Sequence, residues 1–369
     1  MNKKKFKQPD YYLMVIVFLL IVVGFLVSSR VFAEISEQRF GNPTHYFFHQ
    51  LLYGFLLGLV LGVAAYKVSL SSLKKWSLFL ILFNLILMVL VFVPGLKVFS
   101  GGAARWINFG WFTFQPSEFL KLSFIVYLAA LMSSRSSDKR AKKDWKLNLA
   151  PFLTVLGFVV ALLYFQSDLS TLVVISISAL AIYFLSGTPL WQNVLLFLTA
   201  FLVFFIFVFS SSYRMKRIFV LLGISRDPLG IGYQVKQTLI SIGSGGILGQ
   251  GLREFSQMSF IPHLISDSVF AEIGRMLGFL GSALLVALYC LFLWRGVNIA
   301  KNSKDNFSKL LVIGIISWIY SQAIINIGAM LKILPLTGIP LPFISYGGSH
   351  IAIELAAVGL LLNVSSKAK

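Results

Sequence analysis

The sequence has little of what a soluble protein or a disulfide-bonded domain requires. Charged residues make up 12% of its 369 residues, against about a quarter in a typical soluble domain. The one cysteine, Cys290, lies in an apolar run, which excludes a disulfide framework and a cysteine metal cluster. Together with 57% hydrophobic residues and a mean hydropathy of +0.85, these shortages predict a single, all-α, polytopic membrane domain over residues 1–369.

Acidic residues are scarce as well: 13 Asp and Glu stand against 32 Lys and Arg, and the formal net charge is +19. In a soluble protein this excess would suggest nucleic acid. No basic helix with interleaved aromatic residues and no RNA- or DNA-binding motif is present, so we expect no nucleic-acid partner. The tendency of membrane proteins to keep Lys and Arg on the cytoplasmic side explains most of the charge.

Ten apolar segments approach the length of about 20 residues that spans a bilayer as a helix. The predicted spans are 11–27, 45–66, 76–94, 117–132, 149–165, 169–186, 191–210, 269–294, 310–330 and 346–364. They leave short tails at 1–10 and 365–369. No small-residue cleavage site follows the first apolar run, so we expect that helix to be retained as an anchor.

The basic residues predict the orientation of these spans. An even number of spans places both termini on one side, and that side holds nineteen of the 32 basic residues, mostly in short loops and tails. The opposite side holds eleven. Both termini are therefore predicted to be cytoplasmic.

A long outer loop, residues 211–266, precedes the eighth predicted helix. Loops of this length are usually functional or disordered. The stretch ISIGSGGILGQG at 240–251 is too apolar for a disordered linker, so we expect short helices or a re-entrant segment over the outer surface. Its run GSGG at 243–246 could present backbone N–H groups to a phosphate, although a glycine cluster alone is a weak signal.

Charged side chains inside membrane spans mark function or are paired, because they are costly there. Glu118 and Lys121 are three residues apart near the start of a span, and this spacing places them on one helix face. They form either a local ion pair or a charged pair that lines a cavity. The preceding loop carries Arg105 among aromatic residues, a pattern that by itself is typical of an interfacial aromatic belt.

Two aspartates stand at predicted helix starts on the outer side, where Asp is a frequent N-cap. For Asp168 capping is the stronger interpretation. Asp267 also adjoins the basic outer loop, so capping and a chemical role both remain open for it. Glu272 and Arg275 are three apart and are predicted to pair with each other.

The segment 322–364 contains two apolar helical runs on either side of a loop, residues 335–348, which we call the Pro/Gly loop. Its prolines and glycines are Pro335, Gly338, Pro340, Pro342, Gly347 and Gly348. Such a loop cannot lie bare in lipid, because its backbone polar groups would be unsatisfied; it must pack in protein or line a wet cavity. Glu354 follows it, with Lys332 or a helix neighbour as its expected partner.

Four blocks of the chain resemble the SEDS family (shape, elongation, division and sporulation), which includes FtsW and RodA. They are RWINFGWFTFQPSEFLKL at 105–122, QSDLST at 166–171, YRMKRI…DPLGIGYQVKQTLISIGSGGILGQGL at 213–252, and the Pro/Gly loop with ISYGGS at 344–349. The resemblance covers nearly the whole chain. YRMKRI and NIGAM look more like the division-associated FtsW branch than RodA.

The resemblance implies a peptidoglycan glycosyltransferase of the bacterial cytoplasmic membrane that polymerises lipid II at the outer face. A glycan would pass, with inversion, from undecaprenyl diphosphate to the 4-hydroxyl of a GlcNAc. Asp267 occupies the position of the family's essential aspartate, which implies a general base. The implied partners are nascent glycan, a class B penicillin-binding transpeptidase and other divisome or elongasome membrane proteins. An apolar groove between helices would hold the polyprenyl chain.

The leaving diphosphate needs cations or preorganised donors. The residues predicted to bind substrate or diphosphate are Arg105, Glu118, Lys121, Asp168, Arg214, Lys216, Arg217, Ser345, Gly347 and Gly348. A divalent cation, Mg²⁺ or Mn²⁺, could assist them.

Four positions depart from the family pattern around Asp267. His263 replaces a Glu, Ser268 replaces a Phe, and Arg275 and Met276 stand where a Glu-Glu pair is common. These changes alter the charge around the aspartate. Two alternatives are a transporter that flips lipid-linked precursors and an inactive scaffold for a penicillin-binding protein. The specific motifs gather at the outer side, which favours chemistry there.

Overall fold

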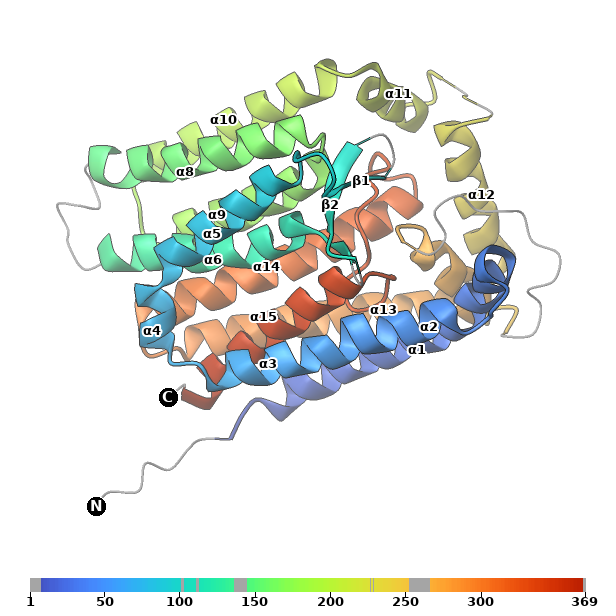
Figure 1. Ribbon diagram of the computed structural model, residues 1–369, viewed down its shortest axis with the longest axis horizontal. Coiled ribbons are helices and arrows are strands. Elements are labelled where there is room, and N and C mark those ends of the chain that lie inside the picture. The colour runs from blue at the N-terminus through green and yellow to red at the C-terminus, as the bar shows by residue number, and fades with distance from the viewer. Residues whose placement is uncertain are drawn as a thin grey trace.

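The computed structural model describes residues 8–100, 103–110, 113–135, 145–225, 227, 229–251 and 266–367, which form a bundle of long helices (Figure 1). The first helices are α1 (Tyr11–Phe40), α2 (His45–His49), the π-helix η1 (Gln50–Leu56), α3 (Leu57–Lys67), α4 (Leu70–Lys75) and α5 (Ser77–Leu90). A small sheet follows, with β1 (Lys97–Ser100), β2 (Ala103–Asn108) and β3 (Thr113–Phe114). The remaining helices are α6 (Pro116–Arg135), α8 (Trp145–Phe165), α9 (Leu169–Leu185), α10 (Leu190–Phe209), α11 (Ser212–Leu221), α12 (Ile231–Ser244), α13 (Val269–Lys301), α14 (Asn306–Met330) and α15 (Gly348–Lys367).

Each of the ten predicted spans coincides with helix. Within the described residues, six helices are long and apolar enough to cross a membrane, and the other four predicted spans contain shorter apolar stretches. The first helix runs to Phe40, well past the predicted end at 27, and stops where Gly41 adopts a left-handed conformation with φ of 64°. The apolar runs therefore predict the mainly helical architecture, but not the length of each helix.

The antiparallel sheet β1-β2-β3 was not predicted. Ile107 pairs with Lys97 on one side and with Phe114 on the other. The aromatic residues of this segment suggested only an interfacial loop. Backbone pairing satisfies the polar groups of a segment that is too short and too rich in glycine for another helix.

The start of α1 and the end of α15 lie at one end of the bundle, and α11 and α12 lie at the opposite end (Figure 1). At the terminal end Asp10 caps α1 by accepting from the N–H of Leu13 at 3.0 Å. Its carboxylate also pairs with Arg295 of α13 at 2.7 Å. This end is thus closed by a bond between the first helix and one of the last. The segment 211–266, predicted to be an outer loop, forms the short helices α11 and α12 in its described part.

The helices α6, α14 and α15 occupy the middle of the bundle (Figure 1). α14 packs against α6, α9 and α13, and α15 packs against α3. The α3–α15 contact is close because it uses glycine: a Cβ on Gly359 would lie 2.1 Å from the carbonyl oxygen of Gly62. Small residues of this kind let membrane helices approach each other closely.

The glycine-rich stretch after α12 packs on a kink in α13. Gly278 has φ of 63° and ψ of −163° within α13, a conformation open essentially to glycine. The N–H of the next residue, Phe279, donates to Gly246 O at 2.9 Å. The N–H groups of Gly245 and Gly246 donate to Ile242 O and Gly243 O. These two amides are therefore bonded within the helix end, and the binding of a phosphate by this run stays a prediction.

Candidate active site

Asp267 lies in the turn that leads into α13, and only 7% of its surface is exposed. Ser266 Oγ donates to its Oδ1 at 2.9 Å, and Asn326 Nδ2 donates to its main-chain oxygen at 2.8 Å. The N-cap position of α13 belongs to Ser268, so the structure does not assign the capping role to Asp267. A carboxylate held in this way can accept a proton from a substrate hydroxyl that comes within hydrogen-bond reach.

Asp168 is the N-cap of α9, as predicted. Its Oδ1 accepts from the N–H of Thr171 at 3.1 Å, and its Oδ2 accepts from the Thr171 hydroxyl at 2.8 Å. Arg105 on β2 reaches the same corner: its Nε donates to Gln166 O at 3.3 Å and its Nη2 to Ser167 O at 2.7 Å. The sheet is therefore tied through Arg105 to the connection between α8 and α9, next to Asp168.

Helix α11 carries the basic residues Arg214, Lys216 and Arg217. Arg214 Nη1 donates to Phe207 O at 2.5 Å, at the end of α10. Arg217 lies 4.8 Å from the ring centroid of Tyr213 and donates to its hydroxyl at 3.0 Å. Lys216 is exposed. The two arginines thus have hydrogen-bond partners within α10 and α11, whereas the Lys216 side chain is exposed.

Electrostatics link α11 to Arg105. Burial lowers the pKa of the Arg214 guanidinium, nearby Tyr164 opposes this, and the charges of Arg105 and Arg217 lower the pKa further. An arginine stays charged in spite of such a shift. Arg105 and Arg217 therefore both lie close enough to Arg214 to lower its pKa. We call these three guanidiniums the positive cluster, of the kind that an anion would neutralise.

Glu118 and Lys121 on α6 form the predicted ion pair, with 2.7 Å between Oε2 and Nζ. Both are 3% exposed. Lys121 Nζ also donates to Gln322 Oε1 on α14 at 3.0 Å and lies 5.1 Å from the Trp318 ring centroid. The ammonium therefore exchanges water for a carboxylate, an amide and an aromatic face, which is how a charge can remain inside a membrane span.

His350 and Glu354 on α15 extend this pair into a larger group. His350 Nδ1 lies 3.5 Å from Glu118 Oε2 and 3.2 Å from Glu354 Oε1. The other carboxylate oxygen of Glu354 accepts from the N–H of Phe343 in the Pro/Gly loop at 2.7 Å. The helix neighbour expected for Glu354 is thus His350. We call Glu118, Lys121, Gln322, His350 and Glu354 the buried cluster.

The Pro/Gly loop is packed inside the protein, one of the two predicted alternatives. Its polar backbone groups bond to side chains from the surrounding helices and from the loop itself. The bonds are Gln322 Nε2 to Pro340 O at 3.0 Å, Tyr289 OH to Pro342 O at 2.6 Å, and Leu341 N to Ser345 Oγ at 2.8 Å. Side chains thus replace the water that an irregular segment would otherwise need.

The other loop residues predicted to bind substrate take part in packing. Ser345 is fully buried and accepts from the Leu341 amide. A Cβ on Gly348 would lie 3.2 Å from Tyr53 O of η1, so this glycine allows α15 to begin close to another backbone. Gly347 O accepts from the N–H of Ile351 at 3.1 Å, in the first turn of α15.

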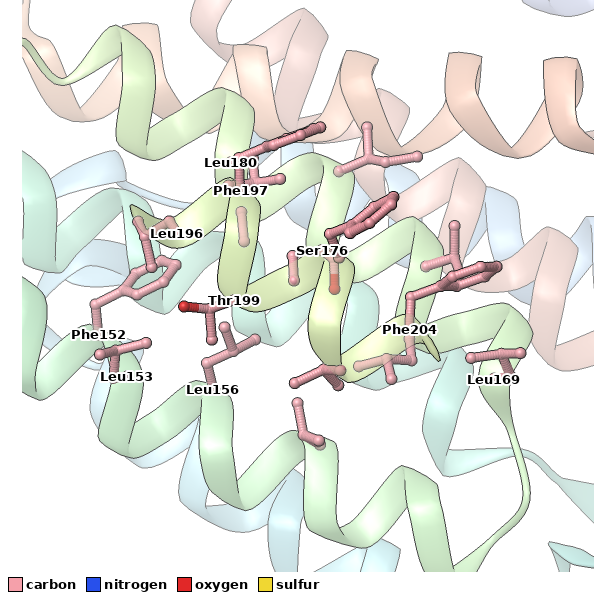
Figure 2. A pocket seen from close by; sticks show the side chains of 18 residues that line it. Phe152, Leu153, Leu156, Leu169, Ser176, Leu180, Leu196, Phe197, Thr199 and Phe204 are labelled. Atoms are coloured by element: carbon pink, nitrogen blue, oxygen red, sulfur yellow. The ribbon is translucent and has the colours of Figure 1, made fainter. Parts of the chain in front are cut away.

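A cavity opens between α8, α9 and α10, and we call it the α8–α10 cavity. It has a volume of about 180 Å³. Figure 2 shows its lining side chains, which run from Phe152 and Leu156 to Leu169 and Phe204. Ser176 and Thr199 are its polar lining residues. Leu169 directly follows Asp168, so the cavity reaches the corner that Arg105 contacts. An apolar space of this kind suits a hydrocarbon chain.

A family model described as "Cell cycle protein", which covers FtsW, RodA and SpoVE, matches residues 11–369. The chain belongs to the FtsW/RodA/SpoVE family.

Named members of the FtsW/RodA/SpoVE family are similar over their full length. Stage V sporulation protein E of Bacillus subtilis (strain 168) is 35% identical over 366 residues, or 99% of each chain. The probable peptidoglycan glycosyltransferase FtsW of Coxiella burnetii is 34% identical over 360 residues, or 96% of each chain. These relatives agree with the resemblance to the FtsW branch.

Solved structures share the fold. One, described as "Structural coordination of polymerization and crosslinking by a peptidoglycan synthase complex", has a TM-score of 0.79 at 26% identity and covers 97% of this chain and 98% of the other. The rod shape determining protein RodA of Thermus thermophilus has a TM-score of 0.71 at 24% identity and covers 98% of this chain and 97% of the other. The chain is a multi-pass membrane protein of this fold.

Three of the four positions that depart from the family pattern are buried and packed. Arg275 forms the predicted pair with Glu272, and both are almost fully buried. Ser268 is fully buried, and its hydroxyl accepts from Gln234 Nε2 at 3.2 Å. Met276 is also buried. The fourth position, His263, lies outside the described residues.

The structure divides the predicted site residues into groups. Asp168 and Arg105 meet at the start of α9, and Arg214 and Arg217 extend that positive charge. Glu118 and Lys121 lie instead inside the helix bundle. Sequence reasoning missed three polar residues: Gln322, Asn326 and His350. The signal that could have found them is their spacing, since Gln322 and Asn326, like His350 and Glu354, are four residues apart in otherwise apolar helices.

Proposed function

We propose that this protein is a peptidoglycan glycosyltransferase that polymerises lipid II, with Asp267 as the general base. The observation that carries the proposal is the placement of Asp267 at the start of α13, where its carboxylate accepts from Ser266 and its main-chain oxygen accepts from Asn326. Family membership supports it, because the chain is 34% identical to a protein named probable peptidoglycan glycosyltransferase FtsW.

In the proposed reaction Asp267 takes the proton from the 4-hydroxyl of a GlcNAc residue. The hydroxyl oxygen then bonds to the anomeric carbon of the donor sugar. The bond between that carbon and the diphosphate oxygen breaks with inversion, and undecaprenyl diphosphate leaves with the electron pair. A positioned general base contributes about 10²–10⁴-fold to such a step.

The positive cluster is the proposed site for the diphosphate. Arg105 and Arg217 both lie close enough to Arg214 to lower its pKa, and Lys216 is exposed on the same helix as Arg214. Their charge would stabilise the anion that forms as the diphosphate leaves. The α8–α10 cavity begins beside Asp168 and would hold part of the polyprenyl chain.

In this proposal Glu118 and Lys121 have an indirect, structural role. Because both are 3% exposed and bonded to their neighbours, they stabilise the contact between α6, α14 and α15 instead of meeting the diphosphate. Ser345, Gly347 and Gly348 likewise shape the loop through packing.

A divalent cation, Mg²⁺ or Mn²⁺, is also proposed. No group of three His, Cys, Asp or Glu side chains in the described part of the chain is arranged to hold one. Mg²⁺ commonly takes one or two carboxylates, water and substrate phosphates. Asp168 would be a protein ligand in such an arrangement, and the ion would neutralise charge on the diphosphate.

The proposed location is the bacterial cytoplasmic membrane with both termini in the cytoplasm. The distribution of basic residues supports it, as does the placement of the start of α1 and the end of α15 at one end of the bundle in Figure 1. The proposed partner is a class B penicillin-binding transpeptidase, with other divisome or elongasome membrane proteins. A similar solved protein belongs to a complex described as coordinating polymerization and crosslinking.

The test is glycan polymerisation from lipid II by the purified protein in vesicles, with and without the transpeptidase. We expect Asp267→Asn to lower the rate by about 10²–10⁴-fold. Asp305→Asn is the matched control, since Asp305 caps α14 by accepting from Ser308 at 2.9 Å and has no proposed chemical role.

Three outcomes separate the proposals. Polymer made by Asp267→Asn at the wild-type rate would be consistent with a glycosyltransferase but would exclude Asp267 as its general base. No polymer from the folded wild type with its transpeptidase would contradict the enzyme. Movement of lipid II across the vesicle membrane in that case would indicate a transporter, and no movement would indicate a scaffold.

A further inference from the structure

Three consecutive residues of the Pro/Gly loop meet three different elements near Asp267. Thr337 O accepts from the Ser170 hydroxyl of α9 at 2.5 Å. A Cβ on Gly338 would lie 3.8 Å from Asp267 Oδ2. Ile339 O accepts from Asn326 Nδ2 of α14 at 2.7 Å. The loop therefore forms one wall beside the aspartate.

Asn326 connects that wall to Asp267. The residue is 1% exposed, and its Nδ2 donates both to Ile339 O and to the main-chain oxygen of Asp267, at 2.7 and 2.8 Å. A side-chain amide nitrogen has two hydrogens, so both are used. One buried side chain thus fixes the distance between the Asp267 backbone and the loop.

Asn326 is itself fixed by the helix that carries it. Gln322, one turn earlier on α14, holds the neighbouring carbonyl of Pro340 and is bonded to Lys121 of the buried cluster. Two amides on one helix face therefore hold two successive loop carbonyls. This arrangement keeps the loop from sliding along α14, and it makes Asn326 a rigid reference point for Asp267.

We propose that Asn326 is a positioning residue for Asp267: it sets where the carboxylate lies without touching the reacting atoms. The inference rests on the proposed role of Asp267 as the base. Displacement of a reacting group by about 1 Å can cost about 10²-fold in rate. Removal of the Asn326 amide would release the Asp267 carbonyl and allow a movement of this kind.

The test uses the full-length protein, lipid II and the transpeptidase, with kcat and KM measured separately. Asn326→Leu is expected to lower kcat by about 10- to 100-fold while KM for lipid II stays within about twofold, since no substrate contact is removed. Asn363→Leu is the matched control: Asn363 also donates to two main-chain oxygens, Ala65 O at 3.0 Å and Val68 O at 2.7 Å, at a site distant in the chain from Asp267. It is expected to leave kcat unchanged.

A double mutant separates positioning from general loss of structure. If Asn326 acts through Asp267, Asn326→Leu should add almost no further loss in an Asp267→Asn background. An equal fold-loss in both backgrounds would overturn the inference, and so would wild-type kcat in folded Asn326→Leu. If Asn326→Leu does not fold, as judged by size-exclusion chromatography, Asn326→Ser takes its place with the same expectations.

The outcomes also distinguish this inference from the proposed function. Wild-type activity in Asp267→Asn would exclude both Asp267 as the general base and Asn326 as its positioning residue. A large loss in Asp267→Asn, with none in Asn326→Leu, would remove the inference alone.

Discussion

The middle of the bundle and the layer formed by α8, α9 and α10 differ in burial and in polarity. In the most apolar stretches of α6, α14 and α15, 78% to 83% of the residues are buried, against 22% for α10. The middle holds the buried cluster and Asn326, whereas the α8–α10 cavity has almost entirely apolar walls.

The difference shows where polar side chains can be kept. Lipid offers no hydrogen-bond partner, so helices that carry charges or amides must face other helices. α10 has few such groups in its middle and can face hydrocarbon. Polar chemistry and the packed loop therefore fall in the middle, and space for a hydrocarbon chain falls at the edge.

Breaking the buried cluster should show this contrast most strongly. Lys121→Met leaves the Glu118 charge buried without its cation, and we expect a loss of about 3–5 kcal/mol in the free energy of unfolding. The double variant with Glu118→Gln should recover most of it. Thermal or denaturant unfolding in detergent measures both variants.

The matching change at the periphery is Arg217→Met. This residue is partly exposed, so the expected loss is under about 1 kcal/mol. Equal losses for Lys121→Met and Arg217→Met would contradict the distinction between the two regions.

Filling the cavity should affect substrate binding instead of stability. Ala200 lines the α8–α10 cavity, and Ala200→Trp would exclude roughly 60 Å² of hydrocarbon contact, or about 1.5 kcal/mol. We expect about a tenfold rise in KM for lipid II, with a smaller change in kcat. Steady-state polymerisation over a range of lipid II concentrations measures it.

Leu198→Trp is the control on the same helix, because Leu198 is 56% exposed and does not line the cavity. A KM that rises equally in both variants would argue against a chain in the cavity.

The smallest effect is expected at the exposed edge of the positive cluster. Lys216→Ala removes a charge that attracts the anionic substrate from a distance, so kcat/KM should fall by about two- to threefold at low salt. At about 0.5 M salt the difference from the wild type should vanish, because exposed charges are then screened. A salt-independent loss would indicate direct contact with the diphosphate instead.

Local patterns predicted much of this structure. Apolar runs located the main helical segments, and spacing of three residues predicted the pairs Glu118–Lys121 and Glu272–Arg275. A polar residue before an apolar run predicted the cap Asp168. Each of these depends on residues close in sequence, where helix geometry alone decides which side chains meet.

The contacts that complete the candidate site are not local. Lys121 and Gln322 are separated by 201 residues, and Asn326 and Asp267 by 59. Their meeting depends on which helices pack together, and helical periodicity does not specify this. The sheet was missed for a related reason, since its strands are short and lack an alternating apolar pattern.

The packed loop also has a consequence for changes in chain length. Surface loops usually tolerate insertions, but here Ile339 and Pro340 are held by two amides one helical turn apart. One added residue before Ile339 would bring a different pair of carbonyls to Gln322 and Asn326 and would move Gly338 away from Asp267. The length of the loop therefore sets its register against α14, and its number of residues matters to the site as much as their identity.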